Sequence, residues 1–144
     1  MQVNTHMFNV NNLFGKGVKN TLLLKNGLNF SVGGPFTSVQ TDTLIDRWQF
    51  TSVSAAEYTL MVDYDTNNKE IIRCLLVGGP NAATVTIYGR GNLGNELITL
   101  AATVNDSYVE LRATAAQGAD STVYYGSKCI FQATYFETLN PITR

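Results

Sequence analysis

Apolar and polar residues alternate along most of the chain after residue 39, and this pattern predicts β-strands. The clearest case is Glu57–Asp65, in which Tyr58, Leu60 and Val62 stand two positions apart between more polar residues. A period of two places successive side chains on opposite faces, which is typical of a strand with one buried face. The segment Glu70–Val77 is apolar at nearly every position, which indicates a strand in the middle of a sheet.

Turn-forming sequences separate further strand-like segments at regular intervals. These predicted strands are Leu44–Thr51, Thr84–Tyr88, Glu96–Val104, Tyr108–Thr114 and Tyr124–Phe136. In the last segment Cys129, Phe131, Ala133 and Tyr135 fall on one face. No segment shows a sustained helical period. About seven to eight short strands at this spacing predict an all-β fold, an antiparallel, jelly-roll-like β-sandwich with an extended N-terminal arm.

The first 34 residues differ from the rest because they are rich in Asn, Gly and Lys. The step Gly33-Gly34-Pro35 then predicts a hinge, since glycine frees the backbone and proline cannot donate to a sheet. We therefore divide the chain into an N-terminal arm, residues 1–34, and a β-sandwich domain, residues 35–144.

The arm carries apolar side chains that suit a subunit interface. They are Phe8, Val10, Leu13, Phe14, Leu22, Leu23, Leu24 and Phe30. An irregular segment with such anchors either lies on a neighbouring subunit and adds a strand to its sheet, or packs back on its own sandwich as an edge strand. The sequence leaves both alternatives open.

Composition and charge narrow the class of partner. Only 15% of the residues are charged and the net charge is −1, without a cluster of Lys and Arg. Phosphate binding needs clustered cations, so we expect no nucleic-acid partner. Weak self-repulsion favours association, and we expect a homo-oligomer. The polar start of the chain and the lack of 18 consecutive apolar residues predict neither a signal peptide nor a membrane span.

Candidate catalytic and metal-binding residues lack chemical partners in the sequence. His6 is the single histidine, so a nucleophile has no other imidazole as a base and the common zinc sites cannot form. Asp42 with Asp46, and Asp63 with Asp65, could act as paired acids or bind calcium, but solvated acids at strand ends explain them as well. We expect no enzyme, no catalytic residue, no metal and no cofactor.

Two other patterns concern ligand binding. Gly89–Gly94 matches the glycine pattern of dinucleotide sites, but it stands between two predicted strands, so we interpret it as a hairpin loop. Trp48, Tyr124 and Tyr125 are possible ligand-facing residues, because exposed aromatic rings stack on sugars. Cys74 and Cys129 lie in apolar segments, where a free thiol behaves as a small buried hydrophobe, and a disulfide between them stays open.

The stretch from Leu44 to Phe136 resembles a β-sandwich domain of structural proteins of tailed phages, especially those of cyanobacteria. The segments that carry the resemblance are Ala55-Ala56-Glu57-Tyr58, Thr86-Ile87-Tyr88-Gly89, Leu93-Gly94, Tyr108–Thr114 and Tyr124–Gln132, in matching order. Residues 1–43 do not share it.

The resemblance implies a structural protein located in the virion, with other virion proteins as partners. We expect first a capsid decoration, or cement, protein that binds the major capsid protein through its arm. The alternative is a component of the phage neck, tail or fibre, with glycan binding as a further possibility.

Overall fold

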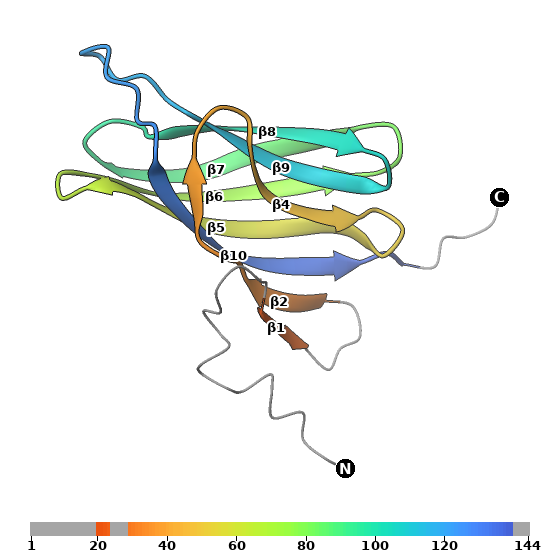
Figure 1. Ribbon diagram of the computed structural model, residues 1–144. Coiled ribbons are helices and arrows are strands. Elements are labelled where there is room, and N and C mark those ends of the chain that lie inside the picture. Colours follow the sequence, from red (N-terminus) through yellow and green to blue (C-terminus); the bar gives the residue numbers. More distant parts are fainter. Residues whose placement is uncertain (1–19, 24–28, 140–144) are drawn as a thin grey trace.

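The computed structural model describes residues 20–23 and 29–139, and the regular elements in these ranges are β-strands (Figure 1). The strands are β1 (Asn20–Leu23), β2 (Asn29–Gly33), β3 (Thr37–Val39), β4 (Thr43–Gln49), β5 (Val53–Asp65), β6 (Asn68–Gly78), β7 (Ala83–Leu93), β8 (Ile98–Asn105), β9 (Tyr108–Ala115) and β10 (Ser127–Glu137). Within these ranges no helix is long and apolar enough to cross a membrane.

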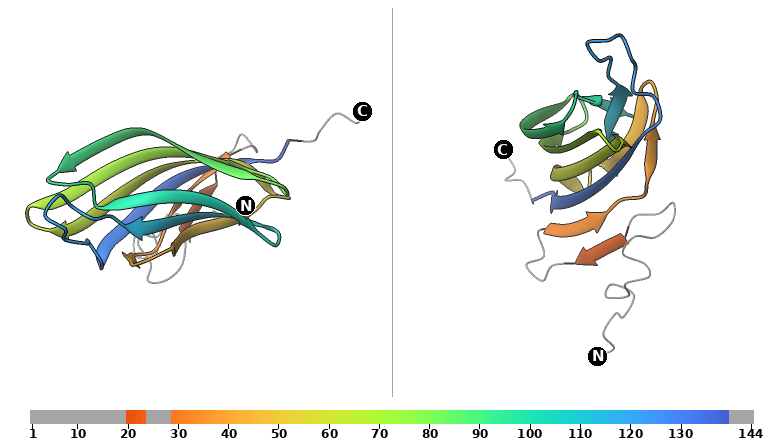
Figure 2. Two further views of the ribbon diagram at one scale, coloured as in Figure 1. Left: turned by 90° about the horizontal axis from the view of Figure 1, so that it is seen from above. Right: turned by 90° about the vertical axis from the view of Figure 1, so that its left-hand side faces the viewer.

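Two antiparallel sheets make up the fold. The larger has seven strands, in the order β1-β2-β10-β5-β6-β7 with β3 also paired to β10, and the smaller has the order β4-β9-β8. The smaller sheet lies over one side of the larger one (Figure 2). The predicted all-β sandwich is therefore confirmed. The described residues form more strands than expected, since β1, β2 and β3 precede the first strand that the alternation predicts.

The core between the sheets is built from the alternate residues that the sequence pattern selects. On β10, Cys129, Phe131, Ala133 and Tyr135 are all buried, which confirms that they share one face. Strands β5 and β6 contribute further inward side chains, which are Tyr58, Leu60, Val62, Ile72, Cys74 and Leu76. Cys74 and Cys129 are free thiols, and burial raises the pKa of each to about 12.

Strand β7 extends through the glycine-rich segment that we had interpreted as a loop. Gly89 pairs with Arg73 and Gly91 with Ile71, so the strand ends only at Leu93. A Cβ atom on Gly91 would lie 3.3 Å from Cγ2 of Ile71. The loop prediction was wrong because these glycines leave room for the side chains of the neighbouring strand and do not mark a turn. The segment joins two strands, β7 and β8, as expected.

At the predicted hinge, Gly33-Gly34-Pro35, the pairing of the chain with one edge of β10 is interrupted between β2 and β3. Strand β2 pairs with Gln132–Phe136 and β3 with Ser127–Cys129, on either side of Phe131. The amide of Gly34 donates to the Phe131 carbonyl at 2.9 Å, and a Cβ atom on Gly34 would overlap the Phe131 ring. Only glycine fits this close approach.

Candidate functional site

The side of the larger sheet that faces away from the smaller one carries exposed apolar residues on its central strands. Met61 and Ile71 are register partners on β5 and β6 and are 38% and 47% exposed. Leu75 and Val77 follow on the same side of β6, at 41% and 54%. We call these four residues, together with the exposed Tyr88 of β7, the outer patch.

The two-sided character of β6 explains the outer patch. Ile72, Cys74 and Leu76 point into the core, and the residues between them point outward. An apolar run on both sides of a strand is typical of a strand buried on both faces, but only the inner side of β6 is covered in the described fold. The largely apolar segment from Glu70 to Val77 was the sequence signal for this surface, and we had used it only to predict a central strand.

The charged residues around the outer patch are engaged with one another. Lys69 Nζ lies 2.8 Å from Asp63 Oδ1. The Tyr88 hydroxyl donates to Glu57 Oε2 at 3.1 Å, and the Arg73 guanidinium carbon lies 5.7 Å from the centroid of the Tyr88 ring. The patch therefore presents apolar surface flanked by charges of both signs that already have partners.

A buried polar cluster joins the two sheets on the inner side. Asp46 on β4 accepts hydrogen bonds from the hydroxyls of Tyr58 on β5, at 2.7 Å, and of Tyr135 on β10. Trp48 Nε1 donates to the Tyr58 oxygen at 3.1 Å. Burial, and next the charge of Asp46, raise the pKa of both tyrosines. The cluster fixes the position of β4 over the larger sheet.

This cluster corrects the interpretation of Trp48 as a ligand-facing residue. Its side chain is only 5% exposed, because Asp46 and Trp48 stand two apart on β4 and both point inward. An unused signal for the cluster was Asp46 itself, the one acidic residue in the predicted strand Leu44–Thr51, next to Ile45 and two positions from Trp48. Such an acid needs hydrogen-bond donors when it is buried.

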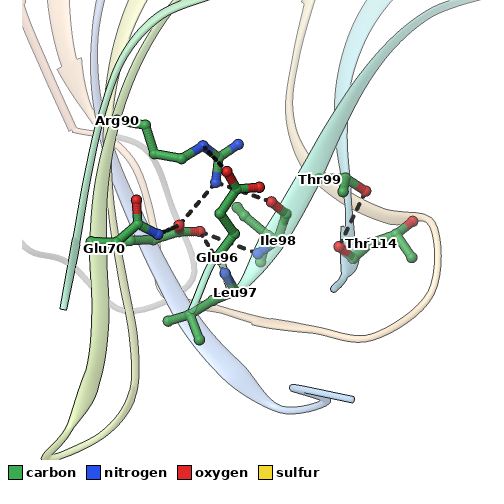
Figure 3. A network of polar contacts seen from close by, with 8 residues as sticks. Glu70, Arg90, Glu96, Leu97, Ile98, Thr99 and Thr114 are labelled. Carbon is green, nitrogen blue, oxygen red and sulfur yellow. Dashed lines mark hydrogen bonds and ion pairs between the residues drawn. The ribbon is translucent and has the colours of Figure 1, made fainter. Parts of the chain in front are cut away.

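A second buried carboxylate, Glu70, holds the crossover from the larger sheet to the smaller one (Figure 3). Its Oε2 accepts from Arg90 Nη1 at 2.9 Å and from Asn92 Nδ2 at 2.8 Å. Its Oε1 accepts from the backbone amides of Leu97 and Ile98, both at 3.1 Å. The four bonds connect β6 and β7 to the start of β8, so this network holds the start of β8 in place against the larger sheet.

The acid pairs suggested by the sequence do not form a shared site. Asp46 is buried in the core, while Asp42 is exposed and interacts with Arg112. Asp63 pairs with Lys69, and Asp65 accepts from the amide of Asn67 and the side chain of Asn68, bonds that lower its pKa. In the described ranges no three His, Cys, Asp or Glu residues gather closely enough to hold a metal ion. His6 lies outside these ranges.

The other two predicted ligand-facing residues differ from each other. Tyr124 is buried, its ring packs edge-on against Tyr64, and its hydroxyl accepts from Asn95, so it does not face a ligand. Tyr125 is exposed. A hollow of about 300 Å³ on the larger sheet is lined by Phe36, Thr37, Ser38 and Lys128. Phe36 is 65% exposed, and no pattern in the sequence had marked it as a candidate residue.

The arm residues fall into two groups. Leu22 and Leu23 lie on β1 and Phe30 on β2, whose backbones pair within the chain's own larger sheet. This part of the arm follows the second of the two alternatives, an edge strand of the same sandwich. Phe8, Val10, Leu13, Phe14 and Leu24 lie outside the described residues, and their place at a subunit interface stays a prediction.

Comparison with known proteins finds no matching family model and no matching curated protein. Solved structures with a similar arrangement include three phage tailspike proteins. They are gp49 of Acinetobacter baumannii bacteriophage Fri1, a capsular polysaccharide depolymerase (9% identity, TM-score 0.41), the tailspike of Acinetobacter phage vB_ApiP_P1 (13%, 0.42) and that of Acinetobacter baumannii phage AM24 (8%, 0.35). The matches cover 96%, 96% and 87% of this chain but only 22%, 23% and 24% of the tailspike chains.

The comparison corrects two expectations. We had excluded an enzyme because no nucleophile and base stand together in the sequence. The first of these neighbours is a capsular polysaccharide depolymerase, so that exclusion does not stand. The phages named are phages of Acinetobacter, and a relation to phages of cyanobacteria is not supported. The three solved structures named above are phage tailspike proteins, while capsid decoration stays a prediction.

Proposed function

We propose that this chain is a β-sandwich module of a bacteriophage tail or fibre, and that the outer patch holds it in the virion. The observation that carries this proposal is the exposed apolar side of β5 and β6, with Met61, Ile71, Leu75 and Val77. Contiguous exposed apolar surface on a folded protein marks a protein–protein contact, because burying it is favourable.

The resemblance from Leu44 to Phe136 supports the virion as the setting. The position of the arm favours the tail or a fibre over capsid decoration. We had expected capsid decoration because the chain is a short single domain with an apolar-studded arm that could anchor it, but β1 and β2 pair within the chain's own sheet. Part of the proposed anchor therefore belongs to the sandwich, which weakens the reason for placing this chain on the capsid.

Locating the chain in the particle tests this proposal. Antibodies raised against the purified protein and visualised by electron microscopy on intact phage should label the tail or its fibres. Labelling of the capsid surface would contradict the tail assignment, and the absence of the chain from purified particles would contradict a virion protein altogether.

The role of the outer patch is tested with a substitution that the fold tolerates. Leu75 lies directly opposite Glu57 on β5, so Leu75→Lys places a cation beside an existing carboxylate. We expect phage carrying this substitution to lose the chain from their particles. The matched control is Thr103→Lys on β8, an exposed position opposite Glu110 on the smaller sheet, which should be incorporated normally.

Glycan binding is a second candidate function, favoured by the hollow at Phe36. A ring that is 65% exposed beside two hydroxyl side chains and Lys128 offers stacking and hydrogen bonding to a sugar. A glycan array probed with the full chain and with Phe36→Ala tests it. We expect a saturable signal that Phe36→Ala abolishes, and a signal unchanged by this substitution would exclude the hollow.

A further inference from the structure

We propose that the outer patch is the contact between two copies of this chain, packed with their larger sheets face to face. This inference rests on the proposed function and names its first partner. It starts from the fact that β6 is covered on one side only, although its outward residues Ile71, Leu75 and Val77 are as apolar as those that form the core.

The size of the surface suits a stable contact between two copies. Four neighbouring strands, β10, β5, β6 and β7, have 11 to 13 residues each. At about 4.8 Å between strands and about 3.3 Å per residue, the whole outer face of these strands, with the outer patch near its centre, has an area on the order of 700 Å². Specific interfaces bury about 800 Å² on each partner. One face of the larger sheet therefore comes close to the area that an interface between two copies needs.

The charges around the patch favour a partner without strong charge of its own. Among the described residues, Glu57 and Asp63 on β5 stand beside Lys69 and Arg73 on β6, and Lys128 on β10 adds a cation opposite Asp63. A strongly basic or acidic partner would find no complementary field here. A second copy has a net charge of only −1 and carries the same mixture of charges on this face, so the repulsion between two copies is weak.

The shape of the face agrees with sheet-on-sheet packing. Two sheets pack about 10 Å apart with their strands nearly aligned, and their side chains interdigitate. On β7 the positions opposite Arg73 and Ile71 are Gly89 and Gly91, which carry no side chain, while the Tyr88 ring lies beside the Arg73 guanidinium. A facing sheet can therefore approach Ile71 without a side chain of Gly91 in the way.

Sedimentation equilibrium of the full chain across the micromolar range tests the contact. We expect the wild type to form a dimer or larger oligomer, and Leu75→Lys to weaken association at least about a hundredfold, because burying a charged ammonium group in an apolar contact is costly. Thr103→Lys should associate like the wild type. A wild type that stays monomeric, or an oligomer that Leu75→Lys leaves intact, would overturn the proposal.

Thiol labelling shows directly what covers the face. Both native cysteines are buried with the pKa raised to about 12, so a maleimide reacts first with an introduced surface cysteine. We expect Val77→Cys to be labelled faster on dilution, as two copies separate, and Thr103→Cys to be labelled at one rate throughout. Slow labelling of Val77→Cys at every concentration would mean that the chain's own segment covers the patch. Fast labelling throughout would mean an uncovered face, and both results contradict a second copy.

These results separate this inference from the proposed function. A monomeric wild type whose Leu75→Lys variant is lost from phage particles would show that the patch binds a different virion protein. A dimer that Leu75→Lys disrupts, together with normal incorporation of that variant, would confirm the contact and contradict the role of the patch in holding the chain in the virion.

Discussion

The two sides of strand β6 have nearly the same apolar content but opposite surroundings. Ile72, Cys74 and Leu76 are fully buried between the sheets, whereas Ile71 and Val77 on the other side are about half exposed. When the chain folds, the inner side chains lose their contact with water, and this burial of apolar surface stabilises the fold. The outer residues keep much of their contact with water, so most of their burial is still available for association. An apolar residue can thus serve folding or assembly depending only on which side of the strand it occupies.

The same contrast holds for the ion pairs on the two sides. Glu70 and Arg90 pair on the inner side at 2.9 Å, with exposed side-chain fractions of 0% and 15%. Asp63 and Lys69 pair on the outer side at 2.8 Å, with 46% and 36% exposed. The distances are nearly equal, so burial is the main difference between the two pairs.

The largest expected effect comes from removing the inner carboxylate. Glu70→Ala should lower the free energy of unfolding by about 3–5 kcal/mol, because Arg90 loses its buried carboxylate partner and two backbone amides lose their acceptor. Asp63→Ala, the control on the outer side, should cost no more than about 1 kcal/mol. Urea denaturation followed by tryptophan fluorescence measures both, and equal losses would show that burial does not separate the two pairs.

Two adjacent leucines give the most direct comparison. Leu76→Ala removes buried side-chain atoms and leaves a cavity, which should cost about 2–4 kcal/mol. Leu75→Ala, one residue earlier and 41% exposed, should cost less than about 1 kcal/mol when the chain is monomeric. Thermal and urea unfolding at low protein concentration measure this difference. A large loss for Leu75→Ala in the monomer would mean that the outer side also contributes to folding.

The buried cluster at Asp46 predicts an intermediate effect. Tyr135→Phe removes one hydroxyl that donates to Asp46 and should cost about 1–3 kcal/mol, while Tyr125→Phe, at an exposed ring, is the control and should be neutral.

The raised pKa of Tyr58 and Tyr135 also predicts alkaline destabilisation. The folded state holds these protons more tightly than the unfolded state, so their contribution is complete below pH 10 and falls as the pH rises above 10. Unfolding free energies measured at increasing alkaline pH should decline less steeply for Tyr135→Phe than for the wild type. Equal slopes would contradict the assignment.

The smallest expected effect on folding is on the outer side. Val77→Thr keeps the shape and the preference of the side chain for a strand, so it should change the free energy of unfolding by no more than about 0.5 kcal/mol. It nevertheless places a hydroxyl in the proposed contact and should raise the dissociation constant of the oligomer. Sedimentation equilibrium beside urea denaturation distinguishes the two effects, and a change in stability without a change in association would contradict the division between the sides.

The sequence by itself determined the strands and the inner face. Alternation in Glu57–Asp65 and Tyr124–Phe136 identified the residues that fill the core, because a period of two fixes which side chains share a side. It also determined that β6 would be apolar on both sides. It did not identify β1 and β2, because β2 pairs with β10, about a hundred positions away along the chain, and β1 joins the sheet through β2.

Only the tertiary structure decided which surfaces are covered. Asp46 and Glu70 look like ordinary strand acids in the sequence, and they become buried centres because donors from distant strands converge on them. Trp48 looks like a stacking platform and becomes a core residue for the same reason. The smaller sheet covers one side of the larger sheet and not the other. Which apolar residues are buried depends on which face the smaller sheet covers, and a local pattern of residues does not show which face that is.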